Sequence, residues 1–190
     1  GDVEGRNPSP LFDTRWYKEK YRIKDDVNAL AHYMSLRDMR FFNPNPYFDA
    51  RYYSAAHADV LDASADAYAH FLLAGCFQGW NPSAEVDLTP YVQDGGADGR
   101  HPFLAYLGSD WNLPQRQADA TLEPAVSPDT GSKDSSSSTI RELVDADYYR
   151  ACYADAVADK RDATGHFMDV GLTELRRPNF YLDPEWYRQT

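Results

Sequence analysis

The sequence predicts an all-α protein made of short helix–turn–helix repeats of about 38 residues, stacked as a small solenoid or bundle. Two observations lead to this prediction. An Asp followed four residues later by Tyr returns along the chain, and a Pro lies five residues before four of these five Asp residues. The motif pairs are Asp13–Tyr17, Asp49–Tyr53, Asp87–Tyr91, Asp145–Tyr149 and Asp183–Tyr187. The prolines are Pro8, Pro44, Pro82 and Pro178.

The composition is that of a folded, acidic domain. Of 190 residues, 43% are hydrophobic and 14% are aromatic, which is enough for a core and argues against disorder. The net charge of −11 repels phosphate backbones and anionic lipid head groups, so we expect no nucleic-acid partner. No apolar run approaches the roughly 20 residues that span a bilayer, so we also expect no membrane span.

The first helix of each unit is predicted to start at the motif Asp. Its carboxylate is a good N-cap, because it accepts hydrogen bonds from the free N–H groups of the first turn. The apolar residue before the Asp and the Tyr four residues after it have the spacing of a hydrophobic staple. We therefore expect a helix of about ten residues after each Asp, for example over residues 50–59.

A second helix is predicted around a His and an aromatic residue that lie twelve residues before the Pro. These pairs are His32–Tyr33, His70–Phe71 and His166–Phe167. In the second unit, either Gly75 or Gly79 is suited to the left-handed C-cap, and Asn81–Pro82 prevents the helix from continuing. Neither short helix can bury its aromatic face alone, so neighbouring units have to pack together.

The recurring side chains suggest chemistry, but packing explains them better. The motif Tyr residues are interpreted as core staples rather than sugar-stacking platforms. One His per unit, without companion His or Cys residues, indicates a structural role and no metal site or cofactor. The motif Asp residues lack the dense spacing of a calcium loop. Cys76 and Cys152 are predicted to be free thiols, with a disulfide between them as the alternative.

The regular spacing breaks in the third unit, and this break divides the chain. From Asp87 to Asp145 the distance is 58 residues, about 20 more than elsewhere, and the excess is rich in Ser, Asp and Pro. We predict a helical block over residues 1–116 (the end of one unit and three units, the third degenerate). A flexible linker or insertion follows over 117–139, and a further unit with the start of the next over 140–190. The linker either joins two blocks or interrupts one continuous stack. Both ends have the look of partial units, so we expect the chain to be cut from a longer protein.

At this level of detail the units resemble a known family. The segment 4–13 (EGRNPSPLFD) and the segment 70–75 (HFLLAG) are similar to tandem repeats appended to bacterial surface-polysaccharide glycosyltransferases of the rhamnan-synthesis type. The resemblance covers residues 1–108 and 143–190, and it departs at residues 76–80, where Glu-Gly-Arg would be expected. It implies an accessory module in a bacterial, cytoplasmic setting, and it implies no catalytic residue.

Three functions are compatible with these features. The leading hypothesis is a non-catalytic module whose partner is the catalytic domain of its parent chain, another protein, or a glycan. The second is a contribution to a glycosyltransferase active site through carboxylate pairs such as Asp25–Asp26 or Asp145–Asp147. The third is carbohydrate binding by exposed aromatic rings, for which Trp80 and Trp111 are the candidates because neither belongs to the motif.

Overall fold

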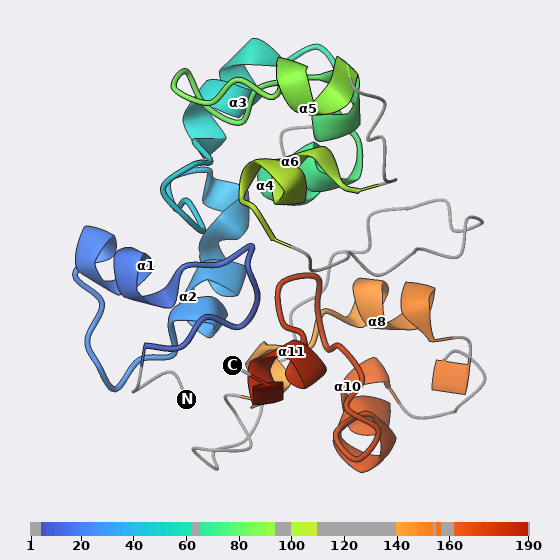
Figure 1. The fold of residues 1–190 in the computed structure, drawn as a ribbon. Coiled ribbons are helices and arrows are strands. Elements are labelled where there is room, and N and C mark those ends of the chain that lie inside the picture. Colours follow the sequence, from blue (N-terminus) through green and yellow to red (C-terminus); the bar gives the residue numbers. More distant parts are fainter. Residues whose placement is uncertain are drawn as a thin grey trace.

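The computed structural model describes residues 5–61, 65–93, 100–109, 140–153, 155–156 and 162–189. Within these ranges the regular structure is helical and extended pairing is limited to isolated bridges, which confirms the all-α class. In Figure 1, α1 and α2 lie between a group formed by α3 to α6 and a group formed by α8, α10 and α11. In chain order, the first six helical elements are α1 (Thr14–Tyr21), α2 (Ala29–Leu36), η2 (Arg37–Met39), α3 (Ala50–Ala56), α4 (Ala67–Leu73) and η3 (Gly75–Gln78). They are followed by α5 (Thr89–Gln93), α6 (Pro102–Tyr106), α8 (Ala146–Cys152), α10 (Ala163–His166), η4 (Phe167–Gly171) and α11 (Pro184–Gln189).

None of the helices in the described ranges has the length and apolarity that a bilayer crossing requires.

The motif Asp residues begin their helices as predicted. The carboxylate of Asp13 accepts from Trp16 N–H at 2.9 Å, and that of Asp49 accepts from the N–H groups of Arg51 and Tyr52. Asp145, at the start of α8, makes the same bond to the residue three positions on. The helices are shorter than the ten residues expected, however. α3 ends at Ala56 because the chain turns at His57, and this turn brings Leu61 into the core.

In three of the five motifs the Tyr lies in the core and is hydrogen-bonded to the His of the same unit. Tyr17, Tyr53 and Tyr149 are fully buried. Their hydroxyl groups contact the Nδ1 atoms of His32, His70 and His166 at 2.9, 2.9 and 3.2 Å respectively. A buried hydroxyl needs a polar partner, so the recurrence of the His follows from the burial of the Tyr.

The two glycines proposed as alternatives for one C-cap have different roles. Gly79 is the left-handed residue, with φ of +74°. Gly75 is buried, and a methyl group on it would overlap the hydroxyl of Tyr53. Gly171 holds the equivalent place in the fourth unit, where a methyl group would come within 2.6 Å of the Tyr149 hydroxyl. Glycine is therefore required here by the close approach of the Tyr–His pair.

One backbone hydrogen bond recurs along the chain. The N–H of a motif Asp donates to the carbonyl oxygen of one of the recurring Pro residues, and we call this bond with its surrounding side chains a joint. The joints are Asp13 to Pro44 (3.0 Å), Asp49 to Pro82 (2.9 Å), Asp145 to Pro178 (2.9 Å) and Asp183 to Pro8 (3.3 Å). The first three join the start of a unit to the Pro at its end, whereas the fourth joins the last motif to the first Pro.

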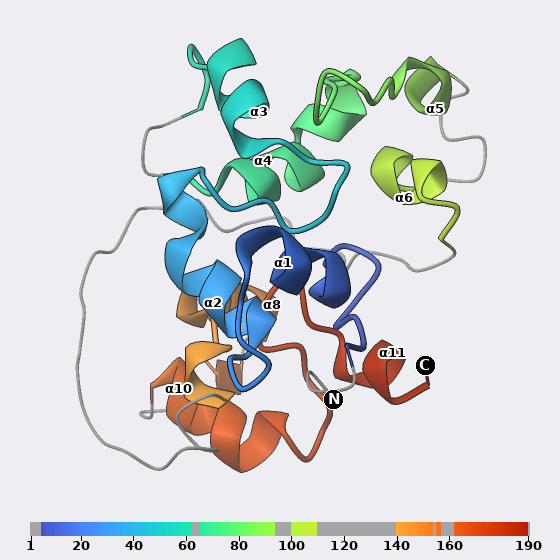
Figure 2. The same ribbon diagram turned by 90° about the vertical axis from the view of Figure 1, so that its left-hand side faces the viewer.

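This fourth joint places α11 beside the segment that starts at Gly5 (Figure 2). The guanidinium of Arg6 lies over the ring of Tyr187 at 5.3 Å. Arg6 lies two residues before its Pro, as Phe42 and Trp80 do before theirs. Phe42 and Trp80 pack against motif Tyr rings, each at a centroid distance of 6.4 Å. Residues 5–8 thus occupy, beside α11, the place that each unit's own tail occupies elsewhere.

The residue before the Pro supports the cap of the helix that follows it. Asn43 Oδ1 accepts from Ala50 N–H at 3.0 Å, and Asn7 and Asn81 make the same bond in their units. In the last unit this residue is Arg177, and the helix begins with Pro184, which has no N–H to donate. Arg177 instead binds the carboxylate of the motif Asp by an ion pair.

The C-terminal segment packs against the N-terminal part through rings and ion pairs. Tyr181 stacks on Tyr68 at a centroid distance of 5.6 Å and shares the larger hydrophobic core. Arg37 of η2 binds Asp145 at 2.8 Å and Asp66 at 3.3 Å. The predicted linker, residues 117–139, lies outside the described residues.

Gly75→Ala is expected to destabilise the protein by about 3 kcal/mol, because the new methyl group has to displace the Tyr53 hydroxyl in a packed core. In a Tyr53→Phe background the same change is expected to cost clearly less, since the overlapping oxygen is gone. Urea unfolding of the two single variants and the double variant measures this coupling. Gly171→Ala is the matched control: Tyr149→Phe should rescue it poorly, because the Phe167 ring also overlaps the added carbon. Equal costs of Gly75→Ala in both backgrounds would contradict the interpretation.

Asn43→Ala is expected to lower the free energy of unfolding by about 1 kcal/mol, because the first N–H of α3 loses its acceptor. Asn43→Asp keeps an acceptor oxygen at the same position and should retain most of the stability. Thermal and urea unfolding of both variants would check this. A loss of the same size in Asn43→Asp would show that the amide nitrogen matters more than the cap.

Candidate binding site

The aromatic residue three positions after the motif Asp is the recurrent ring that the core does not fully enclose. It is Trp16, Tyr52, Tyr148 or Trp186 in four of the five motifs. The side chain of Tyr52 is 38% exposed, whereas the Tyr next to it is fully buried. At the joint after Asp145, Tyr148 meets Phe180 edge-on at a centroid distance of 6.0 Å. There a side chain from the following Pro turn packs against the ring.

At the joints after Asp13 and Asp49 the corresponding space is a hollow of about 220 Å³. Phe180 lies two residues after its Pro, and the residues at this position in the other two turns are Pro46 and Ala84. Ala84 leaves room that Phe180 fills in its own unit. The residues around this space, which we call the joint hollow, are Trp16, Lys20, Asn43, Pro46, Phe48, Asp49, Tyr52, Ser83, Ala84 and Glu85.

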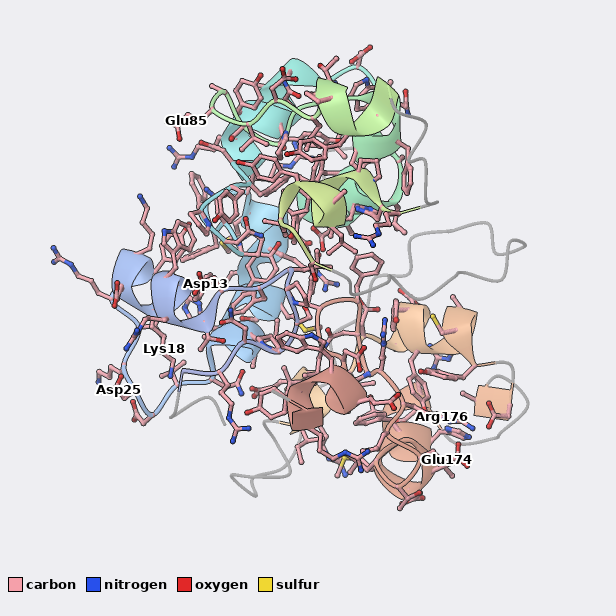
Figure 3. The ribbon with its side chains drawn as sticks, in the orientation of Figure 1. Asp13, Lys18, Asp25, Glu85, Glu174 and Arg176 are labelled. Atoms are coloured by element: carbon pink, nitrogen blue, oxygen red, sulfur yellow. The ribbon has the colours of Figure 1, made fainter. Side chains whose placement is uncertain are left out.

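The polar side of the joint hollow carries groups of both charges. Asp49 uses Oδ1 for the first turn of α3, and Asn43 uses its amide oxygen for the same purpose. The second oxygen of Asp49 and the amide N–H groups of Asn43 are therefore available to a bound molecule. Lys20 and Glu85 are exposed, and Figure 3 shows Glu85 at the outer edge of this part of the molecule. The hollow thus combines aromatic rings with hydrogen-bond donors and acceptors.

The structure gives Trp80, one of the two predicted sugar-binding residues, a packing contact. Its ring stacks on His57 at 4.0 Å with an interplanar angle of 9°, and the side chain is partly buried. It lies at the same position relative to the Pro as Phe42. Trp111, the second candidate, lies outside the described residues. The sequence does not single out Trp16 and Tyr52 as sugar-binding residues, because both belong to the motif. The small residue Ala84, at the position of Phe180, is the feature of the sequence that indicates the hollow.

The carboxylate pairs considered for catalysis do not form one site among the described residues. Asp145 caps α8 and binds Arg37, and Asp66 accepts from the same Arg and from the Tyr181 hydroxyl. Burial opposes the charge of Arg37, but the two carboxylates outweigh burial and raise its pKa. Asp25 and Asp26 are exposed on a loop, where the Asp25 carbonyl oxygen accepts from Lys18 at 3.2 Å (Figure 3).

Both cysteines are free, as expected. Cys76 is buried, and its Sγ lies 3.2 Å from Nε2 of His101. Burial raises the pKa of Cys76 to about 12, so the sulfur is a protonated thiol at neutral pH and a poor nucleophile. Within the described ranges, His, Cys, Asp and Glu side chains do not gather in groups of three or more that would suit a metal ion.

Comparison with models of known protein families, with curated proteins and with solved structures gives no match to this chain.

The lowered pKa values of four histidines determine how the free energy of unfolding is expected to change with pH. Burial lowers the pKa of His32, His57, His70 and His101 below the ordinary value of about 6.5. Between pH about 6.5 and the lowered values, the unfolded chain binds more protons than the folded one, so folding loses stability as the pH falls. Urea unfolding from about pH 7.5 to about 5, above the range of ordinary carboxylates, should show this decline.

His101→Gln is the variant that tests the assignment, because His101 is buried and the amide keeps a polar group beside Leu72 and Cys76. The free energy of unfolding of this variant should depend less on pH over the same range than that of the natural sequence. Stability that stays constant or rises as the pH falls from 7 to 5 would contradict neutral buried histidines.

Proposed function

We propose that this chain is a non-catalytic module of stacked helical repeats within a larger bacterial, cytoplasmic protein of polysaccharide synthesis, such as a glycosyltransferase. The module holds its parent protein against a partner, which is another protein, the catalytic domain of the same chain, or a glycan. The glycosyltransferase setting rests on the resemblance of segments 4–13 and 70–75.

The observation that carries the proposal is the structural use of the recurring polar side chains. Motif Asp residues cap helices, the His residues bind buried Tyr hydroxyls, and the Asn residues before Pro support the caps. These groups keep the same partner from unit to unit, which favours a role in folding over a role in chemistry. What varies is the surface between the units, and a repeat architecture uses such a surface for binding.

An active-site role is less well supported. Asp145, the carboxylate with the most suggestive spacing, is occupied by its helix and by Arg37. Asp147, the other carboxylate of this pair, is exposed on α8.

The immobilised chain is expected to retain a specific protein or glycan from a bacterial extract, and to leave nucleotide sugars unchanged. A control column carrying the heat-unfolded chain distinguishes binding by the folded protein from non-specific binding to exposed apolar side chains. Turnover of a nucleotide sugar by the purified chain would overturn the non-catalytic assignment. Retention of neither a protein nor a glycan at high concentration would contradict the binding role.

A further inference from the structure

We propose that the joint hollow between the first, second and third units binds one ring of a neutral sugar, stacked against Tyr52 and Trp16. This inference rests on the proposed function and specifies the ligand and its site.

The fold itself shows that the position accepts a ring. At the joint after Asp145, the aromatic residue three positions past the Asp is met by Phe180 from the following Pro turn. At the joint after Asp49, the equivalent aromatic is Tyr52 and the equivalent of Phe180 is Ala84. Both Tyr52 and Ala84 line the hollow. A ligand ring would therefore take the place that a Phe side chain takes within the same molecule.

Size limits the ligand to a single ring in the hollow. Sites for drug-sized molecules and cofactors measure roughly 300–1,000 Å³. The joint hollow, at about 220 Å³, is below this range and is open to solvent along exposed residues such as Ala84 and Glu85. One sugar unit of a longer glycan would fit, with the rest of the chain extending along the surface.

The lining favours a sugar over an aromatic side chain from a protein. A sugar ring has an apolar C–H face, which stacks on an aromatic ring, and an edge of hydroxyl groups, which require hydrogen bonds. The hollow provides both kinds of contact. Tyr52 and Trp16 supply the rings, while Asn43, Asp49, Ser83, Glu85 and Lys20 supply donors and acceptors around them. A Phe side chain would offer these polar groups no hydrogen bond.

Charge favours a neutral sugar. Asp49 and Glu85 lie at the hollow with one cation, Lys20, and the whole chain carries a net charge of −11. Two carboxylates beside the ligand would repel a uronic acid, a sialic acid or a phosphorylated sugar.

The test is binding of the full chain to an array of neutral and anionic oligosaccharides, followed by NMR titration with the best neutral glycan. The structure predicts that neutral glycans bind and that the indole N–H signal of one Trp shifts. Ala84→Phe should fill the hollow as Phe180 fills its own joint, and should weaken binding by about tenfold or more with an unchanged melting temperature. Ala84 is exposed, so this variant is expected to fold; Tyr52→Ala, also at an exposed residue, is a second variant with the same expected loss.

Trp80→Ala is the matched control, because that ring is stacked on His57 away from the hollow lining. It should retain binding. The proposal is overturned if no neutral glycan binds at millimolar concentration, if anionic glycans are preferred, or if Ala84→Phe and Tyr52→Ala bind as well as the natural sequence. A protein partner retained in the absence of glycan binding would leave the proposed function standing and reject the sugar site. Failure of both experiments would reject both.

Discussion

The hydrogen bond from the motif Asp N–H to the carbonyl oxygen of a Pro turn is the constraint on which the rest of the structure depends. The same Asp uses its carboxylate to start a helix, so one residue fixes both the beginning of a helix and its distance from the neighbouring turn. The Tyr four residues later is then carried into the core, where its hydroxyl requires the His. Cap, joint, buried Tyr and His are therefore consequences of one arrangement.

Local features of this arrangement were predictable from the sequence because their causes are local. The caps at Asp13, Asp49 and Asp145 follow from the position of a carboxylate before an apolar run. The lengths of the helices were not predictable in the same way. α3 ends at Ala56, three residues before the expected end, because burial of Leu61 depends on packing that sequence spacing does not record.

Long-range contacts could not be predicted from the sequence, for a physical reason. The contact of Arg37 with Asp145 joins residues 108 positions apart, and in the second and fourth units the position of Arg37 is occupied by Gly75 and Gly171. The joint of Asp183 with Pro8 likewise reverses the order of the chain, so that residues 5–8 serve α11. Neither pairing follows from motif spacing, because each depends on which units meet in space. The joint hollow has the same origin, since it depends on which residue of the next turn faces Tyr52.

One substitution at a joint is compensated by a second one nearby, and another is not. Pro184 has no N–H to donate to an Asn oxygen, and the Asn is replaced there by Arg177, which binds the motif carboxylate instead. Tyr148, in contrast, is met by Phe180, while Tyr52 has only Ala84 at the equivalent position and remains 38% exposed. A missing cap is compensated inside the chain, but this missing ring is not. The Tyr52 ring therefore stays in contact with water beside polar side chains. A ligand with both an apolar ring face and hydroxyl groups would bury this ring and also form hydrogen bonds with its polar neighbours.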